Sequence, residues 1–524
     1  MRLIDKIKKM GSLLILSTCC LTSCNFLDVV PPEQAGLGDA VKKPESTLGF
    51  LYSCYTGMEA ASTDEFVFPE LWGHSGQRAG WGLLTPESPG DWKWGNIYRY
   101  IGQCYLFLSQ LPNALDVSEV QKREWTAEAN FLIAYYHFLI LEYYGPCPIT
   151  DSYIDMDTPN NEYHGRYHFD YVTSWISMKL DEAAKDLPAS RIGSEWGRAT
   201  STIAKAVKAQ LLLLAASPLF NGNSDYINVK DNQGRHLFPT QVDNSKWKLA
   251  ADAALEAINC AKENGHEKLY TFSLPINSIS AATRKLLDIG EAVTEKWNEE
   301  IIWGSTRNVN GLQTVAMAKH TKGSHYNARS VLGPTLSVAE AFYSSNGVPI
   351  SEDNSDFWTA NYPNRYEITT IPDEGNNKYY LQIGEQTAYL HLNREPRFYA
   401  SLSFDRGTWY GDGYTNDEPA NLAFYHFRAK EVSGRQTSED HSYTGYLNKK
   451  VCSYKTGLTK DGFSPYRYSF PIIRLADLYL MYAEALNESQ ESPTQDVYDY
   501  VDLVRERAGL KGVKESWSKY SKSP

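Results

Sequence analysis

The chain has 524 residues, of which 42% are hydrophobic and 13% aromatic, so it is long enough to bury an extensive core and too apolar to be a disordered chain. It carries 51 basic and 63 acidic residues, and the net charge of −12 excludes the basic surface that nucleic-acid binding requires. The same charge opposes adsorption to an anionic membrane, so a membrane role would need an anchor.

The first 23 residues are predicted to be the signal peptide of a lipoprotein. Four basic residues among the first nine precede an apolar run at 11–22, which is too short to cross a bilayer as a helix. The run ends in Leu21-Thr22-Ser23-Cys24, and small residues before a cysteine are typical of a bacterial lipobox. Cys24 is therefore the predicted lipidation site, where acyl chains such as palmitate would anchor the protein. The alternative is an ordinary signal peptide that happens to contain this cysteine.

A helical part is predicted at about 40–265, where apolar residues recur at the three- and four-residue spacing of helices. The expected helices are 46–61, 96–111, 118–144, 169–187, 198–217 and 245–264. Three segments, 128–136, 205–213 and 476–484, place small residues three or four positions apart beside bulky ones. This pattern fits tetratricopeptide-type helical pairs, and it fits ordinary helix-bundle packing equally well.

A loop-rich part is predicted at about 266–468, where helical periodicity fades and Tyr, Gly, Asn and Asp become frequent. This composition predicts long loops with short strands. Helices return at 469–510, beginning with an apolar helix at 471–487 that would hold Pro471 in its first turn. Arg474 and Asp477 are three residues apart, so we expect them to pair on one face of that helix.

Four motifs follow one another along most of the chain and resemble those of the SusD/RagB family of outer-membrane nutrient-binding lipoproteins. They are Trp196-Gly-Arg-Ala-Thr200, Asn346-Gly-Val-Pro-Ile350, Asn393-Arg-Glu-Pro-Arg-Phe398 and the apolar segment 471–487. The resemblance implies a mostly α, SusD-like domain at 24–524, in which tetratricopeptide-like helical pairs support an irregular, loop-rich half with short strands. Family members usually continue past 501–510 with another helix. That C-terminal segment is expected to be missing here, which would leave an unfinished polar tail at 515–524 and an uncovered apolar face.

The resemblance also implies a function. A SusD-like protein is a surface-exposed lipoprotein of the outer membrane, anchored by its lipid on the cell exterior. It captures oligosaccharides during polysaccharide utilisation and delivers them to a TonB-dependent, SusC-like transporter, which the helical half is expected to face. Such a protein binds glycan without making or breaking bonds, so no enzyme activity and no cofactor are expected.

Carbohydrate recognition needs flat aromatic faces for the sugar ring and planar polar groups for its hydroxyls. Two stretches, 66–96 and 303–326, supply both and match the family's glycan-binding loops by position. The predicted glycan-binding residues are Trp72, Arg78, Trp81, Asp91, Trp92, Arg307, Asn308 and Tyr326. Trp358, Trp409 and Tyr410 are weaker candidates, whereas Trp94 and Trp303 are expected to pack as part of a helix lead-in and a strand.

The sequence also allows other classes of protein. A glycoside hydrolase needs two carboxylates at a defined separation, which 63 acidic residues could supply, although no recognisable catalytic motif occurs. A non-catalytic helical-repeat scaffold and a peptide-binding protein are further alternatives. No metal site is predicted, because His164 and His168 are expected in a solvated loop and Asp353 to Asp356 in a turn. Five cysteines beyond Cys24 show no paired spacing, so we expect buried thiols.

The anchor prediction is tested by labelling with radioactive palmitate in a bacterium that processes lipoproteins. The wild-type chain should take up the label, and Cys24→Ala should not, because the acyl chains would be joined through that residue. Cys20→Ala is the matched control and should still be labelled. Label retained by Cys24→Ala would refute the assignment.

Overall fold

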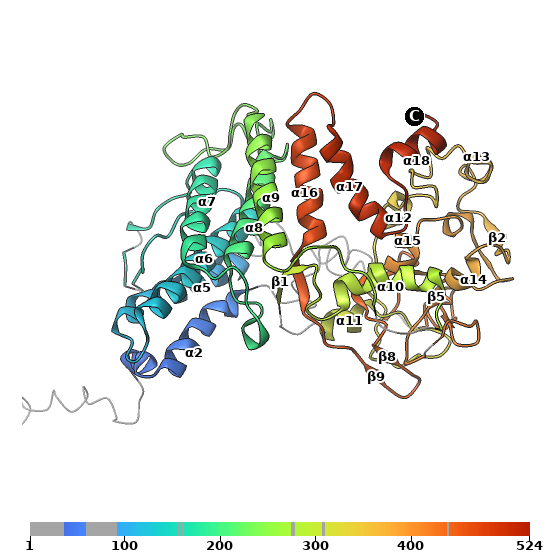
Figure 1. Ribbon diagram of the computed structural model, residues 1–524, viewed down its shortest axis with the longest axis horizontal. Helices are drawn as coiled ribbons and strands as arrows, with labels where there is room; N and C mark the ends of the chain where they lie inside the picture. Colours follow the sequence, from blue (N-terminus) through green and yellow to red (C-terminus); the bar gives the residue numbers. More distant parts are fainter. Residues whose placement is uncertain are drawn as a thin grey trace, which may run out of the picture.

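The computed structural model describes residues 36–58, 92–155, 157–159, 162–273, 278–305, 310–414, 416–436 and 440–524. Within these residues the chain forms a mostly α protein with a helical half beside a loop-rich half (Figure 1). Two of the last helices of the chain, α16 (Leu475–Glu488) and α17 (Gln495–Arg507), pack next to the helical half, α16 directly on α9 (Ser245–Glu263). The predicted fold class is therefore confirmed.

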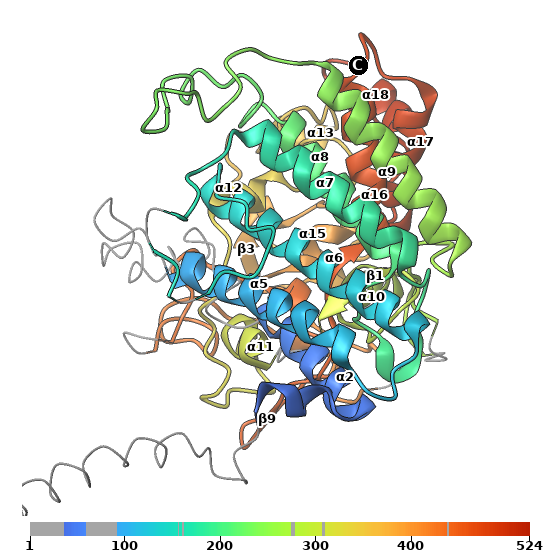
Figure 2. The same ribbon diagram turned by 90° about the vertical axis from the view of Figure 1, so that its left-hand side faces the viewer.

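The helical half is a row of antiparallel neighbours, each packed on the next (Figure 2). Helix α5 packs on α6, α6 on α7, α7 on α8, and α8 on α9, and α16 and α17 then extend the row beyond α9. The bounds are α2 (Pro44–Cys54), α5 (Trp92–Gln110), α6 (Glu119–Tyr144), α7 (Phe169–Asp186), α8 (Ser201–Ala216), α9 (Ser245–Glu263), α16 (Leu475–Glu488) and α17 (Gln495–Arg507). Short 3-10 turns are η1 (Leu37–Val41), η2 (Tyr55–Gly57), η4 (Leu111–Asn113) and η6 (Gly193–Glu195).

Local capping explains why most helix bounds could be predicted from the sequence. The Ser118 side chain accepts the Gln121 N–H while the Gln121 side chain accepts the Ser118 N–H, a capping box that starts α6. Gly145 has a φ of +67° and ends α6 at the predicted break. Three predicted bounds were wrong: α2 ends at Cys54 instead of 61, α5 begins at Trp92 instead of 96, and α8 begins at Ser201 instead of 198.

The loop-rich half contains short helices and two-stranded antiparallel pairs. Its helices are α10 (Ala281–Thr294), α11 (Asn310–Ala316), α12 (Leu336–Ala341), α13 (Asp356–Asn361), α14 (Asn377–Tyr380) and α15 (Pro396–Ser401), with 3-10 turns η7 (Tyr389–His391) and η8 (Lys449–Val451). The strand pairs are β2 (Ile368–Thr370) with β3 (Gln386–Ala388), β4 (Leu402–Phe404) with β7 (Tyr446–Asn448), β5 (Thr408–Trp409) with β6 (Ala423–Phe424), and β8 (Gly457–Leu458) with β9 (Phe463–Ser464). Helix α10 was not predicted, although Ser280 caps it through the Thr283 N–H.

The predicted helix at 471–487 begins later than expected, because its first four residues form a strand. β10 (Phe470–Arg474) pairs antiparallel with β1 (Ile301–Ser305), and Pro471 lies opposite Gly304 at an irregular point of the register. The helix starts at Leu475. The predicted pair is confirmed: Arg474 donates to Asp477 from its main-chain N–H at 2.9 Å and from Nη2 at 2.8 Å.

The polar C-terminal tail at 515–524 is folded. Helix α18 (Val513–Tyr520) follows α17, and the Lys522 N–H donates to the Glu352 carbonyl at 2.8 Å. The Asn354 N–H in turn donates to the Tyr520 carbonyl at 2.9 Å. An apolar surface is nevertheless open on the neighbouring helices, where Leu480 and Leu503 are each 43% exposed.

A buried carboxylate joins the two halves. Glu300 precedes β1 and has no solvent exposure. It accepts from Arg507 Nη1 at 2.7 Å, from Arg474 Nη1 at 3.3 Å and from the Tyr270 N–H at 2.9 Å. Next to it, Trp303 packs against Phe131 and Tyr135 of α6, so the core of the helical half extends into β1.

Glu300→Gln should lower the free energy of unfolding by about 3 kcal/mol, because it leaves the buried Arg507 guanidinium without its carboxylate and removes one of the two carboxylates that pair with Arg474. Urea denaturation followed by circular dichroism measures the change. The matched control is Glu119→Gln, since the Glu119 side chain is 79% exposed and pairs with Lys122 at the surface. The control should change the free energy by less than about 1 kcal/mol, and an equal effect of both variants would contradict the assignment.

Candidate functional site

Most of the residues predicted to bind glycan lie outside the described residues. These are Trp72, Arg78, Trp81, Asp91, Arg307 and Asn308, together with the predicted anchor Cys24. Trp92 is the first residue of α5. Tyr326 is 73% exposed, and its ring lies 4.3 Å from that of His325. The predicted site is therefore not tested as a unit, and Tyr326 alone is seen with an exposed ring.

The weaker aromatic candidates are corrected by the structure. Trp358, Trp409 and Tyr410 are 1%, 2% and 7% exposed, so their faces pack in the protein core and offer no platform to a sugar. Trp303, expected to be a strand residue, is fully buried in β1 and donates its indole N–H to the Gly197 carbonyl at 3.1 Å. Aromatic side chains are more often core than ligand platform, and loop position alone did not separate the two.

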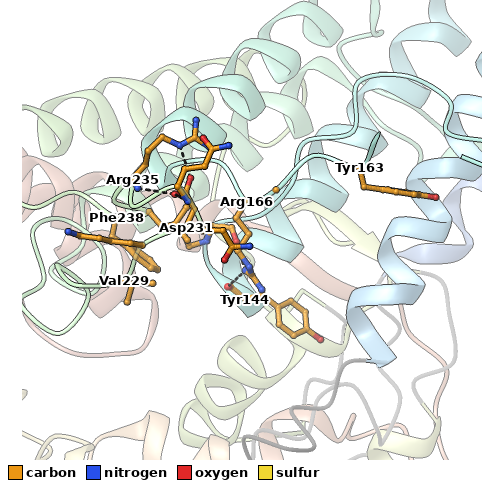
Figure 3. Close-up of a pocket in the computed structure, with 13 residues that line it drawn as sticks. Tyr144, Tyr163, Arg166, Val229, Asp231, Arg235 and Phe238 are labelled. Carbon is orange, nitrogen blue, oxygen red and sulfur yellow. Dashed lines mark hydrogen bonds and ion pairs between the residues drawn. The ribbon is translucent and has the colours of Figure 1, made fainter. Parts of the chain in front are cut away.

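A broad pocket of about 800 Å³ lies where two loops of the helical half meet (Figure 3). One loop leaves the C-terminal end of α6 and leads to α7, and the other connects α8 to α9. We call it the hairpin pocket, and it is lined by Tyr144, Pro146, Tyr163, Gly165, Arg166, Val229, Lys230, Asp231, Asn232, Gln233, Arg235, Leu237 and Phe238.

One wall of the hairpin pocket is built at the end of α6. Arg166 donates from Nη1 to the carbonyl oxygens of Tyr144, at 3.2 Å, and of Pro146. Its guanidinium lies 4.7 Å from the ring centroid of Trp94, and the main-chain N–H of Trp94 donates to the Tyr144 hydroxyl at 3.2 Å. Trp94 therefore packs in a helix start, as predicted. The predicted binding stretch 66–96 thus ends at this wall.

The opposite wall is a hairpin closed by the bridge between Lys230 and His236. Asp231 accepts from the N–H groups of Gln233 and Arg235, both at 2.9 Å, and from Arg235 Nε at 2.6 Å. These donors, first the main-chain N–H of Arg235, lower the pKa of Asp231 below its usual value. Asp231 consequently stays ionised and holds the hairpin in shape.

Aromatic side chains complete the hairpin pocket. Phe238 is 8% exposed and stacks on Tyr226, with ring centroids 4.6 Å apart. Phe220 and Phe169 continue this stack behind it. Tyr163 is 49% exposed and lies on the side away from the hairpin (Figure 3). Exposed aromatic faces beside charged hydrogen-bonding groups are the chemistry that recognises a sugar ring and its substituents.

Sequence reasoning missed this pocket, although a signal was present. The connection between α8 and α9 runs from 217 to 244 without regular helix or strand, and connections of that length in a compact protein are often functional. The segment Asp231-Asn-Gln-Gly-Arg235 within it has turn composition. Tryptophan, which guided the prediction toward the stretch 66–96, does not occur in this connection.

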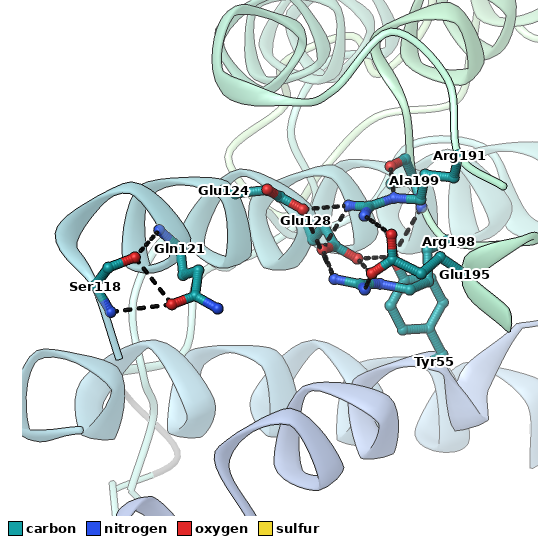
Figure 4. Close-up of polar contacts among 9 residues, drawn as sticks. All are labelled: Tyr55, Ser118, Gln121, Glu124, Glu128, Arg191, Glu195, Arg198 and Ala199. Carbon is teal, nitrogen blue, oxygen red and sulfur yellow. Dashed lines mark hydrogen bonds and ion pairs between the residues drawn. The ribbon is translucent and has the colours of Figure 1, made fainter. Parts of the chain in front are cut away.

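A buried ion cluster fixes α6 relative to the loop before α8 (Figure 4). Glu128 of α6 has no solvent exposure and pairs with Arg191 at 2.8 Å and with Arg198. Tyr55 donates its hydroxyl to Glu128 at 2.5 Å, and burial raises the pKa of this hydroxyl well above its usual value. Arg198 belongs to the first family-like motif, so that motif has a structural role here.

Arg394, from the third motif, is also structural. It is 2% exposed and donates to the carbonyl oxygens of Leu390, Ala339 and Phe342 at 2.9, 2.7 and 2.6 Å. Burial lowers its pKa to about 10, which leaves it protonated at neutral pH. The arginine of this motif thus holds together the loops around α12 and α15 through hydrogen bonds to their carbonyl oxygens.

Two buried titratable groups border a second pocket of only about 40 Å³. Burial raises the pKa of Glu291 to about 7 and lowers that of Lys449 to about 7. Lys449 Nζ donates to the carbonyl oxygens of Tyr399 and Thr408, both at 2.9 Å, and Glu291 accepts from the Thr294 hydroxyl at 2.8 Å. A space of this size holds a few water molecules and no sugar ring, so these groups serve packing.

Several described residues bear on the other roles considered from the sequence. Asp231 is the one carboxylate in the described lining of the hairpin pocket, whereas glycoside hydrolysis needs two. Among the residues that the structure describes, no group of three or more His, Cys, Asp or Glu side chains could hold a metal ion. His168 caps α7 by accepting the Asp170 N–H, and Asp353 forms a turn with Ser355, as predicted. The five described cysteines are free thiols.

Comparison with known proteins identifies the family. A family model described as the SusD family matches residues 299–523, and a second, described as "Starch-binding associating with outer membrane", matches residues 84–212. The solved structure of BT4246 is 35% identical, with a TM-score of 0.75, over 90% of this chain and 83% of that chain. This chain belongs to the SusD/RagB family.

More distant SusD-like structures share the fold. A SusD-like protein from Bacteroides fragilis (BF3747) is 18% identical, with a TM-score of 0.64, over 92% of this chain and 82% of its own. A SusD-like carbohydrate binding protein from the same species (BF0978) is 16% identical, with a TM-score of 0.55, over 90% and 79%. No curated protein matches this SusD/RagB chain. None of its described helices has the length and hydrophobicity needed to span a membrane.

Phe238→Ala should lower the free energy of unfolding by about 3 kcal/mol, because it empties the middle of an aromatic stack. Urea denaturation measures this change. Tyr163→Ala, on the exposed side of the same pocket, is the control and should stay within about 0.5 kcal/mol of the wild type. Similar losses in both variants would show that Tyr163 is also part of the packed core.

Proposed function

We propose that this SusD/RagB protein captures oligosaccharides at the cell surface, with the hairpin pocket as part of its glycan-binding site. The observation that carries the proposal is the position of the pocket: its α6 wall contacts Trp94, where the tryptophan-rich stretch 66–96 ends. A ligand in the pocket would therefore lie near the start of α5, whose first residue is the predicted site residue Trp92. The family description of starch binding and outer-membrane association supports the same role.

The proposed mechanism is binding without chemistry. Tyr163 offers an exposed ring, and the hairpin offers amide, guanidinium and ammonium groups to sugar hydroxyls. The walls are preorganised, because the Arg166 and Asp231 hydrogen bonds are made within the protein alone. Preorganised walls reduce the ordering cost on binding, while each sugar hydroxyl must still give up water, so moderate affinity is expected.

The proposed glycan capture also implies delivery of the bound oligosaccharide to a transporter. A lipid on Cys24 would hold the protein on the exterior of the outer membrane. The exposed face of the helical row would then contact a TonB-dependent, SusC-like transporter, which receives the oligosaccharide. The non-enzymatic character of the protein is part of this proposal.

The test is a panel of soluble polysaccharides run in affinity gels, with the products checked by chromatography. The wild-type protein should be retained by at least one polymer without cleaving it. Tyr163→Ala should reduce retention several-fold, because a stacking face is lost. Tyr366→Ala is the matched control, since Tyr366 is 50% exposed in the loop-rich half, and it should bind as the wild type does.

Other outcomes of the panel point to the alternatives. Release of smaller sugars would support a glycoside hydrolase. Absence of retention on every polymer would favour a helical scaffold or a peptide-binding protein. Equal retention of Tyr163→Ala and wild type would remove the hairpin pocket from the site.

A further inference from the structure

The charge of the hairpin pocket is opposite to that of the whole chain. The protein has a net charge of −12. The described lining of the pocket nevertheless contains three cationic side chains, Arg166, Lys230 and Arg235, against the single carboxylate of Asp231. A local excess of positive charge in a concave site attracts anions and raises their local concentration.

The one carboxylate is already engaged by the protein. Asp231 accepts two main-chain N–H groups and Arg235 Nε, all within its own hairpin. These bonds account for its lowered pKa, with the main-chain N–H of Arg235 as the first cause. Asp231 thus neutralises part of the Arg235 charge and fixes the direction of that side chain. It has little capacity left for a ligand hydroxyl.

The cations retain free donors. Arg235 has a side chain that is 69% exposed, and its Nη1 and Nη2 make no hydrogen bond to any residue that the structure describes. The Lys230 ammonium likewise has no acceptor within the described part of the chain, and this residue is exposed. Arg166 uses Nη1 for the two carbonyl oxygens of its wall. In Figure 3, Arg235, Asp231 and Arg166 come from the two facing loops.

We propose that the hairpin pocket selects acidic saccharides, that is, sugars carrying a carboxylate or a sulfate group. This inference rests on the proposed function and names its substrate class. The two terminal nitrogens of Arg235 form the planar fork that binds a carboxylate or sulfate in a bidentate manner, and Lys230 adds a point charge beside it. Tyr163 supplies the ring face for the sugar. A neutral sugar would leave the donors of both cations without an anionic partner.

The test measures binding of matched ligands to the full-length protein by calorimetry. The probes are oligogalacturonide, its methyl ester, a chondroitin sulfate oligosaccharide and neutral galactan and starch oligosaccharides. The wild type should bind oligogalacturonide or chondroitin sulfate at least about tenfold more tightly than the neutral probes and the ester, since charged hydrogen bonds are worth that much. Binding of the acidic probe should weaken as salt rises.

Variants separate this pocket from general charge effects. Lys230→Gln and Arg235→Gln should each weaken binding of the acidic probe about tenfold and weaken binding of the neutral probes much less, because the Gln amide can still donate to a sugar hydroxyl. Lys460→Gln removes an exposed lysine on the turn between β8 and β9 and is the matched control, which should bind as the wild type does. Circular dichroism confirms that each variant is folded.

The outcomes distinguish this inference from the proposed function. Binding of neutral probes alone overturns the acidic preference and leaves glycan capture standing. Acidic binding that is unchanged in Lys230→Gln and Arg235→Gln overturns the assignment to this pocket. Failure of every probe, acidic and neutral, overturns both proposals. Selective loss with oligogalacturonide indicates a uronic acid ligand, and selective loss with chondroitin sulfate indicates a sulfated one.

Discussion

The structure depends on the carboxylate of Glu300, which is held without solvent between Arg474 and Arg507. A buried charge costs several kcal/mol unless ionic partners and hydrogen bonds surround it, and Glu300 has two arginines and the Tyr270 N–H. β1, next to Glu300, pairs with β10, through which the chain leaves the loop-rich half and which ends at Arg474. The same ion cluster therefore closes that half and attaches it to the helical row through α17.

A second buried carboxylate positions the candidate site. Glu128 of α6 binds Arg191 and Arg198, so α6 cannot rotate or slide without exposing an unpaired charge. Tyr144, at the end of the same helix, forms a wall of the hairpin pocket. The pocket thus combines a wall on a rigid helix with a hairpin loop, which is the usual arrangement for binding loops on a stable scaffold. Its positive lining on an acidic protein gives it a ligand preference that the family assignment alone does not contain.

Much of the helical half was predictable, because the signals for helices are local. The caps at Ser118 and Gly145 and the apolar spacing between them lie within one segment. The candidate site was predicted less well. Trp358, Trp409 and Tyr410 are residue types that could form a sugar-binding platform. Their burial excludes that role, and burial depends on contacts with distant segments of the chain. Helix α10 was missed because its surroundings have the composition of loops.

The sequence by itself determined the helical class, the order of the helices and the SusD/RagB motifs, because spacing and capping act over a few residues. Only the tertiary structure decided that Pro471 to Arg474 form a strand, since their partner β1 is distant in the chain and Glu300, which Arg474 contacts, lies 174 residues away from it. It also decided that Tyr144, Arg166 and the hairpin at Lys230 share one pocket. Burial and long-range pairing depend on which segments meet in space, and no local pattern carries that information.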